Sequence, residues 1–127
     1  MGGYLVLSEK QIPMKHLTSL MGCSNGMILD LVSHSIKIKA NPGNYSDILR
    51  NKSLLMIFEK PSLRTRVSFQ VGMHQLGGHS IVLETKDTPF REKESIADTA
   101  KASSRYVDII MARLFKQEDI EEMAVNS

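Results

Sequence analysis

The 127-residue sequence contains one cysteine, Cys23, and no tryptophan. A single cysteine excludes an internal disulfide and fits a reducing compartment, so we expect a cytoplasmic location. No apolar run approaches the roughly 20 residues of a membrane-spanning helix, and the N-terminus lacks the basic segment of a secretory signal. The four histidines and Cys23 show no metal-ligand spacing, so neither a metal nor another cofactor is expected.

Neither glycine-rich nucleotide motif, G-x-G-x-x-G or G-x-x-x-x-G-K-S/T, occurs in the sequence. Sixteen basic and 14 acidic side chains give a net charge of +2, which is too small by itself to indicate a nucleic-acid partner. Aromatic residues, at 6%, are also few for base stacking. With 42% apolar and 24% charged residues, the chain has the composition of a globular domain with a packed core.

Apolar segments and turn signals alternate along the chain in the order of an α/β domain. Strands are predicted at Ser53–Phe58, His79–Leu83 and Val107–Leu114, and Leu5–Leu7 fits either a short further strand or a leader. Helices are predicted from a cap at Ser24 or Asn25 to the turn at Asn41, from Arg64 to Leu76, from Ser95 to about Arg105, and over Gln117–Val125. Because helical segments separate successive strands, those strands should be parallel. We therefore expect a three-layer α/β domain with a mainly parallel four-stranded sheet flanked by helices.

Local signals mark the ends of two of these helices. Ser95, with Asp98 three residues later, resembles a capping box. Gly77 is placed to end the helix that begins near Arg64. One side of that helix carries Val67, Val71, His74 and Leu76, of which His74 is expected to take part in helix packing. The methionines, Met73 among them, are expected in the core and not at a cofactor site.

The most informative segment is Leu54–Gly78, in which a strand, a turn and a helix follow one another. The turn and the helix start carry two hydroxyl groups and three fixed positive charges, on Lys60, Ser62, Arg64, Thr65 and Arg66. The first turn of a helix also offers unpaired N–H groups and the positive end of the peptide dipoles. This combination predicts a site for a phosphate or another multiply charged anion. The plainer alternative is a capped helix start with solvated arginines.

The predicted topology brings other basic segments to the same place. In parallel α/β sheets, ligands bind outside the carboxyl ends of the strands. The turn with Ser62 follows one such end, the loop Glu84–Glu94 follows a second, and Arg113 lies at a third. We expect these segments to meet at one edge of the sheet. Of the remaining charges, Arg66 is expected to form a structural ion pair, and Lys60 to be solvated or paired, rather than to touch a ligand.

Five blocks of sequence occur in an informative order: FEKPSLRTRVSF from Phe58, GGH at Gly77–His79, ESIADTA at Glu94–Ala100, SRYVD at Ser104–Asp108 and MARLFKQEDIEEMA at Met111–Ala124. Together they resemble the aspartate/ornithine carbamoyltransferase family over roughly residues 16–125. Lys60 and the ARLFKQ block are more similar to the ornithine enzyme than to the aspartate enzyme.

The resemblance implies that residues 1–127 are a carbamoyl-phosphate-binding domain. The ornithine enzyme transfers a carbamoyl group from carbamoyl phosphate to ornithine, giving citrulline and phosphate, as in arginine biosynthesis or a urea-cycle type of step. By this resemblance, Ser62, Arg64, Thr65 and the backbone of Leu63 would hold the phosphate. Thr65 and Arg113 would act as catalytic residues that reach the carbamoyl oxygen, which needs donors as charge develops on it. The resemblance implies no metal and no cofactor.

The sequence departs from the family pattern in two ways. Leu63 stands where the motif usually has Thr, which is tolerable if the position acts through its N–H and weakens binding if a hydroxyl matters. The family's His-Pro-x-Gln motif and its ornithine-binding second domain are absent. We therefore expect a fragment that binds carbamoyl phosphate without turning over alone, with ornithine binding only through the missing domain. In this family the loop that corresponds to Glu84–Glu94 reaches toward a neighbouring subunit's site, so the resemblance implies a homotrimer. Pro89 stands where relatives often place a polar contact, which puts that contribution in doubt.

Other functions stay open on the residues alone. The Pro-Ser-x-Arg-Thr-Arg core is shared with aspartate carbamoyltransferase, so the domain could serve aspartate or another amine. A non-catalytic α/β module that binds phosphate or a nucleotide is a second alternative. A nucleic-acid binder has only the modest positive charge in its favour, and we expect neither nucleic acid nor a membrane as a partner.

Overall fold

The computed structural model describes residues 14–127. The chain divides into two compact units, Met1–Tyr45 and Ser46–Ser127. The choice between a strand and a leader at Leu5–Leu7 falls outside the described residues. Within the described part of the chain, no helix combines the length and the apolar character needed to cross a membrane.

The described part of the first unit is built around one helix, α1 (Asn25–Ala40). The Oγ of Ser24 accepts a hydrogen bond from the N–H of Met27 at 3.2 Å, so Ser24 is the N-cap. This cap satisfies one of the donors that a helix start leaves unpaired. Asn41 is the C-cap, which confirms the predicted end of the helix. Short 3-10 turns precede and follow it, η1 (Leu20–Gly22) and η2 (Pro42–Tyr45).

The second unit contains the sheet, which consists of β1 (Ser53–Phe58), β2 (His79–Glu84) and β3 (Ile109–Arg113). Its strand order is β2-β1-β3, and both pairings are parallel. The prediction of a parallel sheet is confirmed. The described residues form three strands where four were expected, because the candidate for the fourth lay at Leu5–Leu7. The central position of β1 explains why every residue from Leu54 to Phe58 is buried.

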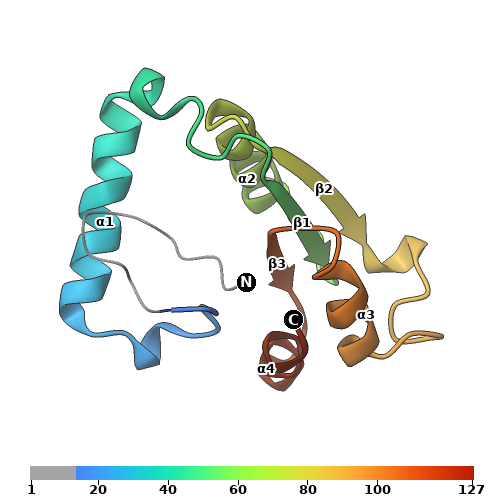
Figure 1. Cartoon of the computed structure of the whole chain (residues 1–127). Helices are drawn as coiled ribbons and strands as arrows, with labels where there is room; N and C mark the ends of the chain where they lie inside the picture. Colours follow the sequence, from blue (N-terminus) through green and yellow to red (C-terminus); the bar gives the residue numbers. More distant parts are fainter. Residues whose placement is uncertain (1–13) are drawn as a thin grey trace. The chain divides into compact units, whose positions relative to one another are not determined.

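Helices cover both faces of this sheet (Figure 1). They are α2 (Arg64–Gln75), α3 (Ile96–Ser103) and α4 (Gln117–Asn126), with a 3-10 turn η3 (Thr85–Asp87) after β2. On one face, Met73 of α2 packs with Leu54 and Met56. On the other face, Ile96 of α3 packs with Leu55, in a cluster that α4 also joins. Because alternate residues of β1 point to opposite faces, the central strand supplies both halves of the core, and the three-layer prediction is confirmed.

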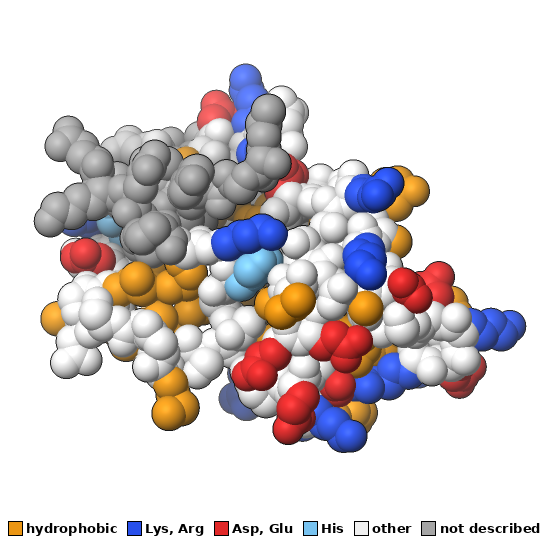
Figure 2. All heavy atoms as spheres, turned by 60° about the horizontal axis from the view of Figure 1, so that its bottom comes forward, with side chains coloured by type: hydrophobic (Ala, Val, Ile, Leu, Met, Phe, Trp, Pro, Cys, Tyr) orange, Lys and Arg blue, Asp and Glu red, His pale blue; other side chains and the backbone are white. Residues whose placement is uncertain are grey.

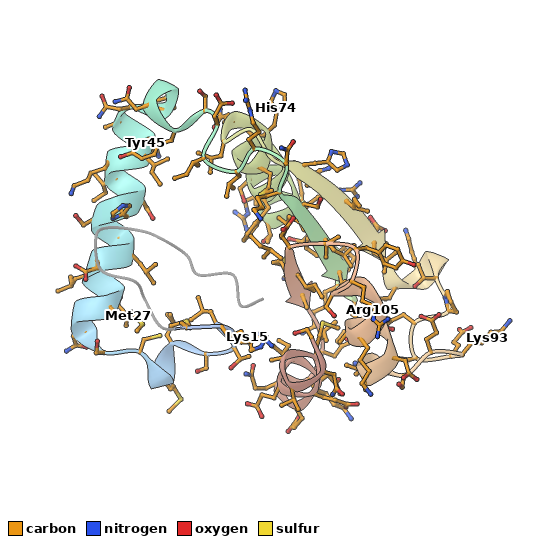
Figure 3. All side chains as sticks on the ribbon, viewed as in Figure 1. Lys15, Met27, Tyr45, His74, Lys93 and Arg105 are labelled. Atoms are coloured by element: carbon orange, nitrogen blue, oxygen red, sulfur yellow. The ribbon has the colours of Figure 1, made fainter. Side chains whose placement is uncertain are left out.

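In α2, Met73 is buried as predicted, but His74 does not pack as predicted. Val67 and Val71 are each 47% exposed, and His74 is exposed and points away from the sheet (Figure 3). The residue that enters the core is Met73. The helix carries apolar side chains on more than one side, so its pattern alone did not determine which side faces the sheet.

The turn from α2 to β2 requires glycine. The N–H of Gly78 bonds to the carbonyl of Met73 at 2.8 Å, and the N–H of Gly77 bonds to that of His74. Gly77 has a φ of +84°, and a Cβ there would lie 2.5 Å from the carbonyl oxygen of Ser46. This is a Schellman end, and it confirms that Gly77 closes the helix.

The predicted N-terminal signal of α3 is also confirmed. The Oγ of Ser95 accepts a hydrogen bond from the N–H of Asp98 at 3.0 Å and donates to its carboxylate at 2.8 Å. The helix ends at Ser103, two residues before the predicted end. The third strand, Ile109–Arg113, is also shorter than the prediction.

Candidate functional site

The connection from β1 to α2 forms the first part of the candidate site. Ser62 and Leu63 precede the helix, and Arg64 and Thr65 are its first two residues. The first intrahelical hydrogen bond runs from the N–H of Val67 to the carbonyl of Leu63 at 2.9 Å. Leu63 is 77% exposed, and its side chain makes no capping bond. Within the described residues, the N–H groups of Arg64 and Thr65 have no hydrogen-bond partner, so this helix start presents free donors.

The second part of the site is the end of β3. The Cα of Phe58 is in register with that of Glu84 on one side and that of Arg113 on the other. The last residues of all three strands therefore lie side by side, as the topology predicted. The N–H of Glu59 donates to the carbonyl of Arg113 at 3.0 Å. The turn that begins at Glu59 is thus joined directly to the strand end that carries Arg113.

Several basic residues at this edge are already paired. Arg66 Nη1 lies 2.8 Å from Glu84 Oε1, which confirms the structural ion pair predicted for Arg66. Lys86 Nζ lies 3.0 Å from the other oxygen of Glu84. The hydrogen bond from Lys86, with a smaller contribution from Arg66, lowers the pKa of the Glu84 carboxyl below its ordinary value. Lys60 Nζ lies 5.0 Å from the centre of the Phe115 ring, so it is a paired charge in the sense of a cation–π contact.

A second carboxylate, that of Glu59, pairs with Arg91 in the loop after β2. Arg91 donates through Nε and Nη2 to both oxygens of Glu59, the latter at 3.0 Å, and through Nη2 to Asp119 of α4. The N–H of Phe115 donates to Glu59 Oε2 at 2.8 Å. These bonds, the Arg91 bond most strongly, lower the pKa of Glu59 although its burial opposes the shift. Two basic residues of the loop Glu84–Glu94, Lys86 and Arg91, are therefore paired with carboxylates.

The predicted site residues differ from these paired cations. The side chains of Ser62, Arg64, Thr65 and Arg113 form no hydrogen bond or ion pair with any other described residue. Two guanidinium groups and two hydroxyl groups are thus unpaired around one helix start and one neighbouring strand end. Some of these donors can bind a phosphate group while another donates a hydrogen bond to an oxygen elsewhere in the same ligand.

The structure brings the site residues together only in part. Ser62–Thr65 form one continuous turn, and Arg113 ends the adjacent strand. A shallow groove runs along the outer side of α2, where Leu63, Arg64 and Val67 are among its lining residues, but Arg113 is not. The groove follows one helix surface and is mostly apolar, so we do not assign the anion site to it.

The sequence did not predict the cluster of Glu59, Arg91 and Asp119. Arg91 is 32 residues from Glu59 and 28 residues from Asp119 in the chain. No periodicity or spacing links residues so far apart. The only signal was the position of Glu59, a carboxylate directly after a strongly apolar strand segment.

The described residues give no support to a metal site or to a basic surface for nucleic acid. No group of three or more His, Cys, Asp or Glu side chains between residues 14 and 127 is placed to hold a metal ion. On the face seen in Figure 2, the basic side chains are interspersed with acidic ones and form no continuous patch.

Comparison with known proteins identifies the family. Residues 15–127 match the family model described as the aspartate/ornithine carbamoyltransferase, carbamoyl-P binding domain. The chain is 43% identical over 114 residues to the catabolic ornithine carbamoyltransferase of Halobacterium salinarum, covering 90% of this chain and 39% of that protein. It is 46% identical over 113 residues to the ornithine carbamoyltransferase of Campylobacter fetus, covering 87% and 37%.

A solved structure gives the same result. The anabolic ornithine carbamoyltransferase of Campylobacter jejuni matches with a TM-score of 0.83 and 38% identity, covering 90% of this chain and 37% of that one. The chain thus spans well under half the length of the relatives that it matches. The family match extends over all the site residues named above, and it follows that this chain belongs to the aspartate/ornithine carbamoyltransferase family, with residues 15–127 forming the carbamoyl-phosphate-binding domain.

Proposed function

We propose that the carboxyl edge of the sheet binds carbamoyl phosphate. In this proposal the hydroxyls of Ser62 and Thr65, the guanidinium of Arg64 and the free N–H groups at the start of α2 hold the phosphate. Arg113 and Thr65 donate to the carbamoyl oxygen. The observation that carries the proposal is that these side chains are unpaired, whereas Arg66 and Arg91 at the same edge are bound to carboxylates.

The chemistry of carbamoyl transfer fits this set of donors. When an amine attacks the carbonyl carbon, the carbonyl oxygen gains negative charge, and when the C–O bond to phosphate breaks, charge grows on the phosphate oxygens. Arg113 would stabilise the first charge and the Ser62–Thr65 turn the second. Each hydrogen bond to a charged group contributes about 1.5–3 kcal/mol net. After the cost of association is subtracted, four such bonds correspond to binding of roughly millimolar strength or somewhat tighter.

The complete reaction needs parts beyond this site. We propose that residues 1–127 act as one carbamoyl-phosphate-binding domain, that a second domain binds ornithine, and that the product is citrulline. The high identity to ornithine carbamoyltransferases supports ornithine as the acceptor. The domain alone is then inactive in transfer. A homotrimer in the cytoplasm, acting in arginine biosynthesis, is the assembly and role we propose for the complete enzyme.

A second acceptor deserves a test. The catalytic subunit of the M. jannaschii aspartate transcarbamoylase matches with a TM-score of 0.81 and 32% identity, covering 90% of this chain and 39% of that one. Since the acceptor does not bind the residues named above, the phosphate site serves aspartate or another amine equally well. A transfer assay on a chain that carries the second domain, with ornithine and aspartate in separate reactions, distinguishes the two.

Calorimetric titration tests the binding proposal. We expect the chain to bind carbamoyl phosphate in preference to ATP and NAD. Arg64→Ala should reduce that affinity by at least about tenfold, because it removes a charge-assisted donor. Arg105→Ala is the matched control, since Arg105 is an exposed arginine that precedes β3 instead of following it. A preference for a nucleotide, or equal losses in both variants, would contradict the proposal.

A further inference from the structure

The loop between β2 and α3 is fixed by an arginine in an unusual backbone conformation. Arg91 has a φ of +65°, in the left-handed region that glycine adopts most easily. Its N–H bonds to the carbonyl of Glu94 at 2.9 Å, and Phe90 beside it is buried in the core. Lys93, two residues later, is exposed and points away from the rest of the unit (Figure 3). A residue other than glycine at this φ costs energy, and an interaction of the Arg91 side chain can offset that cost.

That interaction is with Glu59 and Asp119. The Glu59 side chain is 4% exposed and that of Asp119 is 13% exposed, whereas Arg91 is 37% exposed. Arg91 meets Glu59 through two parallel N–H···O bonds, which fixes the orientation of both groups. Asp119 lies in the first turn of α4, so the arginine joins the loop, the end of β1 and the start of α4.

Glu59 also holds the backbone on both sides of the candidate site. Its N–H donates to the carbonyl of Arg113, and its carboxylate accepts from the N–H of Phe115. The next residue, Lys60, lies over the ring of Phe115. Ser62 follows three residues after Glu59. Glu59, which precedes the Ser62–Thr65 turn, is therefore hydrogen-bonded both to Arg113 and to Phe115.

We propose that Arg91 and Glu59 form a positioning pair that sets the distance between the Ser62–Thr65 turn and the Arg113 strand end. The pair touches no substrate in this proposal. It acts by fixing the two segments that do, so that one ligand can meet both. The inference rests on the proposed function for its consequence in binding, but the linkage itself is a property of the free chain.

The consequence concerns preference between ligands. Inorganic phosphate needs only the Ser62–Thr65 turn, whereas carbamoyl phosphate needs the turn and Arg113 at the correct separation. Loosening the pair should therefore spare phosphate binding and reduce the preference for carbamoyl phosphate. A general loss of folding stability would instead lower the affinities for both ligands together.

The first experiment uses the free chain. Amide hydrogen exchange is measured by NMR in the wild type, Arg91→Gly, Glu59→Gln and the control Asp108→Asn. Glycine suits the backbone at position 91, so Arg91→Gly removes the ion pairs without demanding a strained φ. Asp108 joins β1 and β3 at their other end, where its carboxylate accepts from the N–H of Ser53 at 2.8 Å. We expect exchange at Phe115 to rise by about tenfold or more in the first two variants, with shifted resonances at Ser62–Thr65, and neither change in Asp108→Asn.

The second experiment titrates carbamoyl phosphate and inorganic phosphate into the same proteins. In Arg91→Gly and Glu59→Gln, the ratio of the two affinities should fall by about fivefold or more, while the affinity for phosphate changes by less than about twofold. Arg91→Lys, which keeps the charge, should recover part of the ratio.

The outcomes separate the two proposals. An unchanged exchange rate of the Phe115 amide in Arg91→Gly overturns the positioning pair. An equal loss of affinity for both ligands in folded variants overturns it as well. If the wild type binds neither ligand, the proposed function fails, and the exchange data still decide whether the pair links the two segments.

Discussion

The two ends of the sheet use the same kind of contact in different surroundings. At the amino end, the Asp108 carboxylate accepts the N–H of Ser53 at 2.8 Å and pairs with Lys52 at 3.0 Å. At the carboxyl end, the Glu59 carboxylate accepts the N–H of Phe115 at 2.8 Å and pairs with Arg91. Each joins β1 to β3. The Asp108 side chain is 37% exposed, whereas that of Glu59 is 4% exposed.

The difference follows from the direction of the helices. In this β-α-β order, helices begin at the carboxyl end of the strands and end at the amino end. The carboxyl end therefore gathers free N–H groups and favours anions, while the amino end gathers carbonyl groups and does not. Arg105 follows α3 at the amino end and is exposed, and in the chain it lies between the end of that helix and the start of β3.

The largest expected effect is that of Arg113→Ala in a chain that also carries the second domain. Turnover should fall by about 10²–10³, the scale for loss of one donor to a developing oxyanion. Arg105→Ala, at the opposite end, should leave turnover unchanged. Steady-state transfer assays with carbamoyl phosphate and ornithine measure both. A loss smaller than about tenfold in Arg113→Ala would give Arg113 another role.

The next effect compares the two carboxylates in folding stability. Glu59→Ala should lower the free energy of unfolding by about 2 kcal/mol or more, because Arg91 loses its bidentate partner and the N–H of Phe115 loses its acceptor. Asp108→Ala should lower it by about 1 kcal/mol or less, since its partner Lys52 is 54% exposed. Urea denaturation at neutral pH gives both values. Equal losses would mean that the difference in burial between the two ends has no energetic consequence.

Acid should separate the two ends further. The pKa values of Glu59 and Asp108 are both lowered in the folded chain, Glu59 chiefly by the Arg91 bond and Asp108 chiefly by the Ser53 N–H. A lowered folded pKa contributes stability that is present above the ordinary value, 4.5 for Glu59, and is lost as the pH falls through the folded value. Stability should therefore decline below that pH, and less steeply in Glu59→Gln than in the wild type. Urea midpoints at several acidic pH values measure the slopes, and identical slopes would contradict the contribution of Glu59.

Structural features that depend on neighbouring residues were predictable from the sequence, and so was the order of the strands and helices. The helix start at Arg64, the Ser95 cap and the end at Gly77 were predictable because each rests on neighbouring residues. The position of Arg113 beside β1 was predictable because alternating strands and helices require a parallel sheet. These local and topological rules were enough to indicate the candidate edge.

The remaining features depend on contacts that no local rule specifies. The Glu59–Arg91 pair joins residues 32 apart, through an arginine whose φ suits glycine. The packing predicted for His74 was also wrong, whereas Met73 of the same helix is buried as predicted. Two apolar sides on one helix leave the choice to the shape of the sheet beneath, which the sequence pattern does not describe.

The smallest expected effect concerns Leu63, the one residue of the Ser62–Thr65 turn without a polar side chain. Leu63 has φ of −81° and ψ of −58°, which are helical values, and its side chain is directed to solvent. A side-chain cap normally requires an extended backbone at this position, so a threonine there would not cap the helix in this way. Leu63→Thr should therefore change the affinity for carbamoyl phosphate by less than about threefold, because the position contributes its N–H. A larger gain in a calorimetric titration would mean that a hydroxyl at this position binds the phosphate directly.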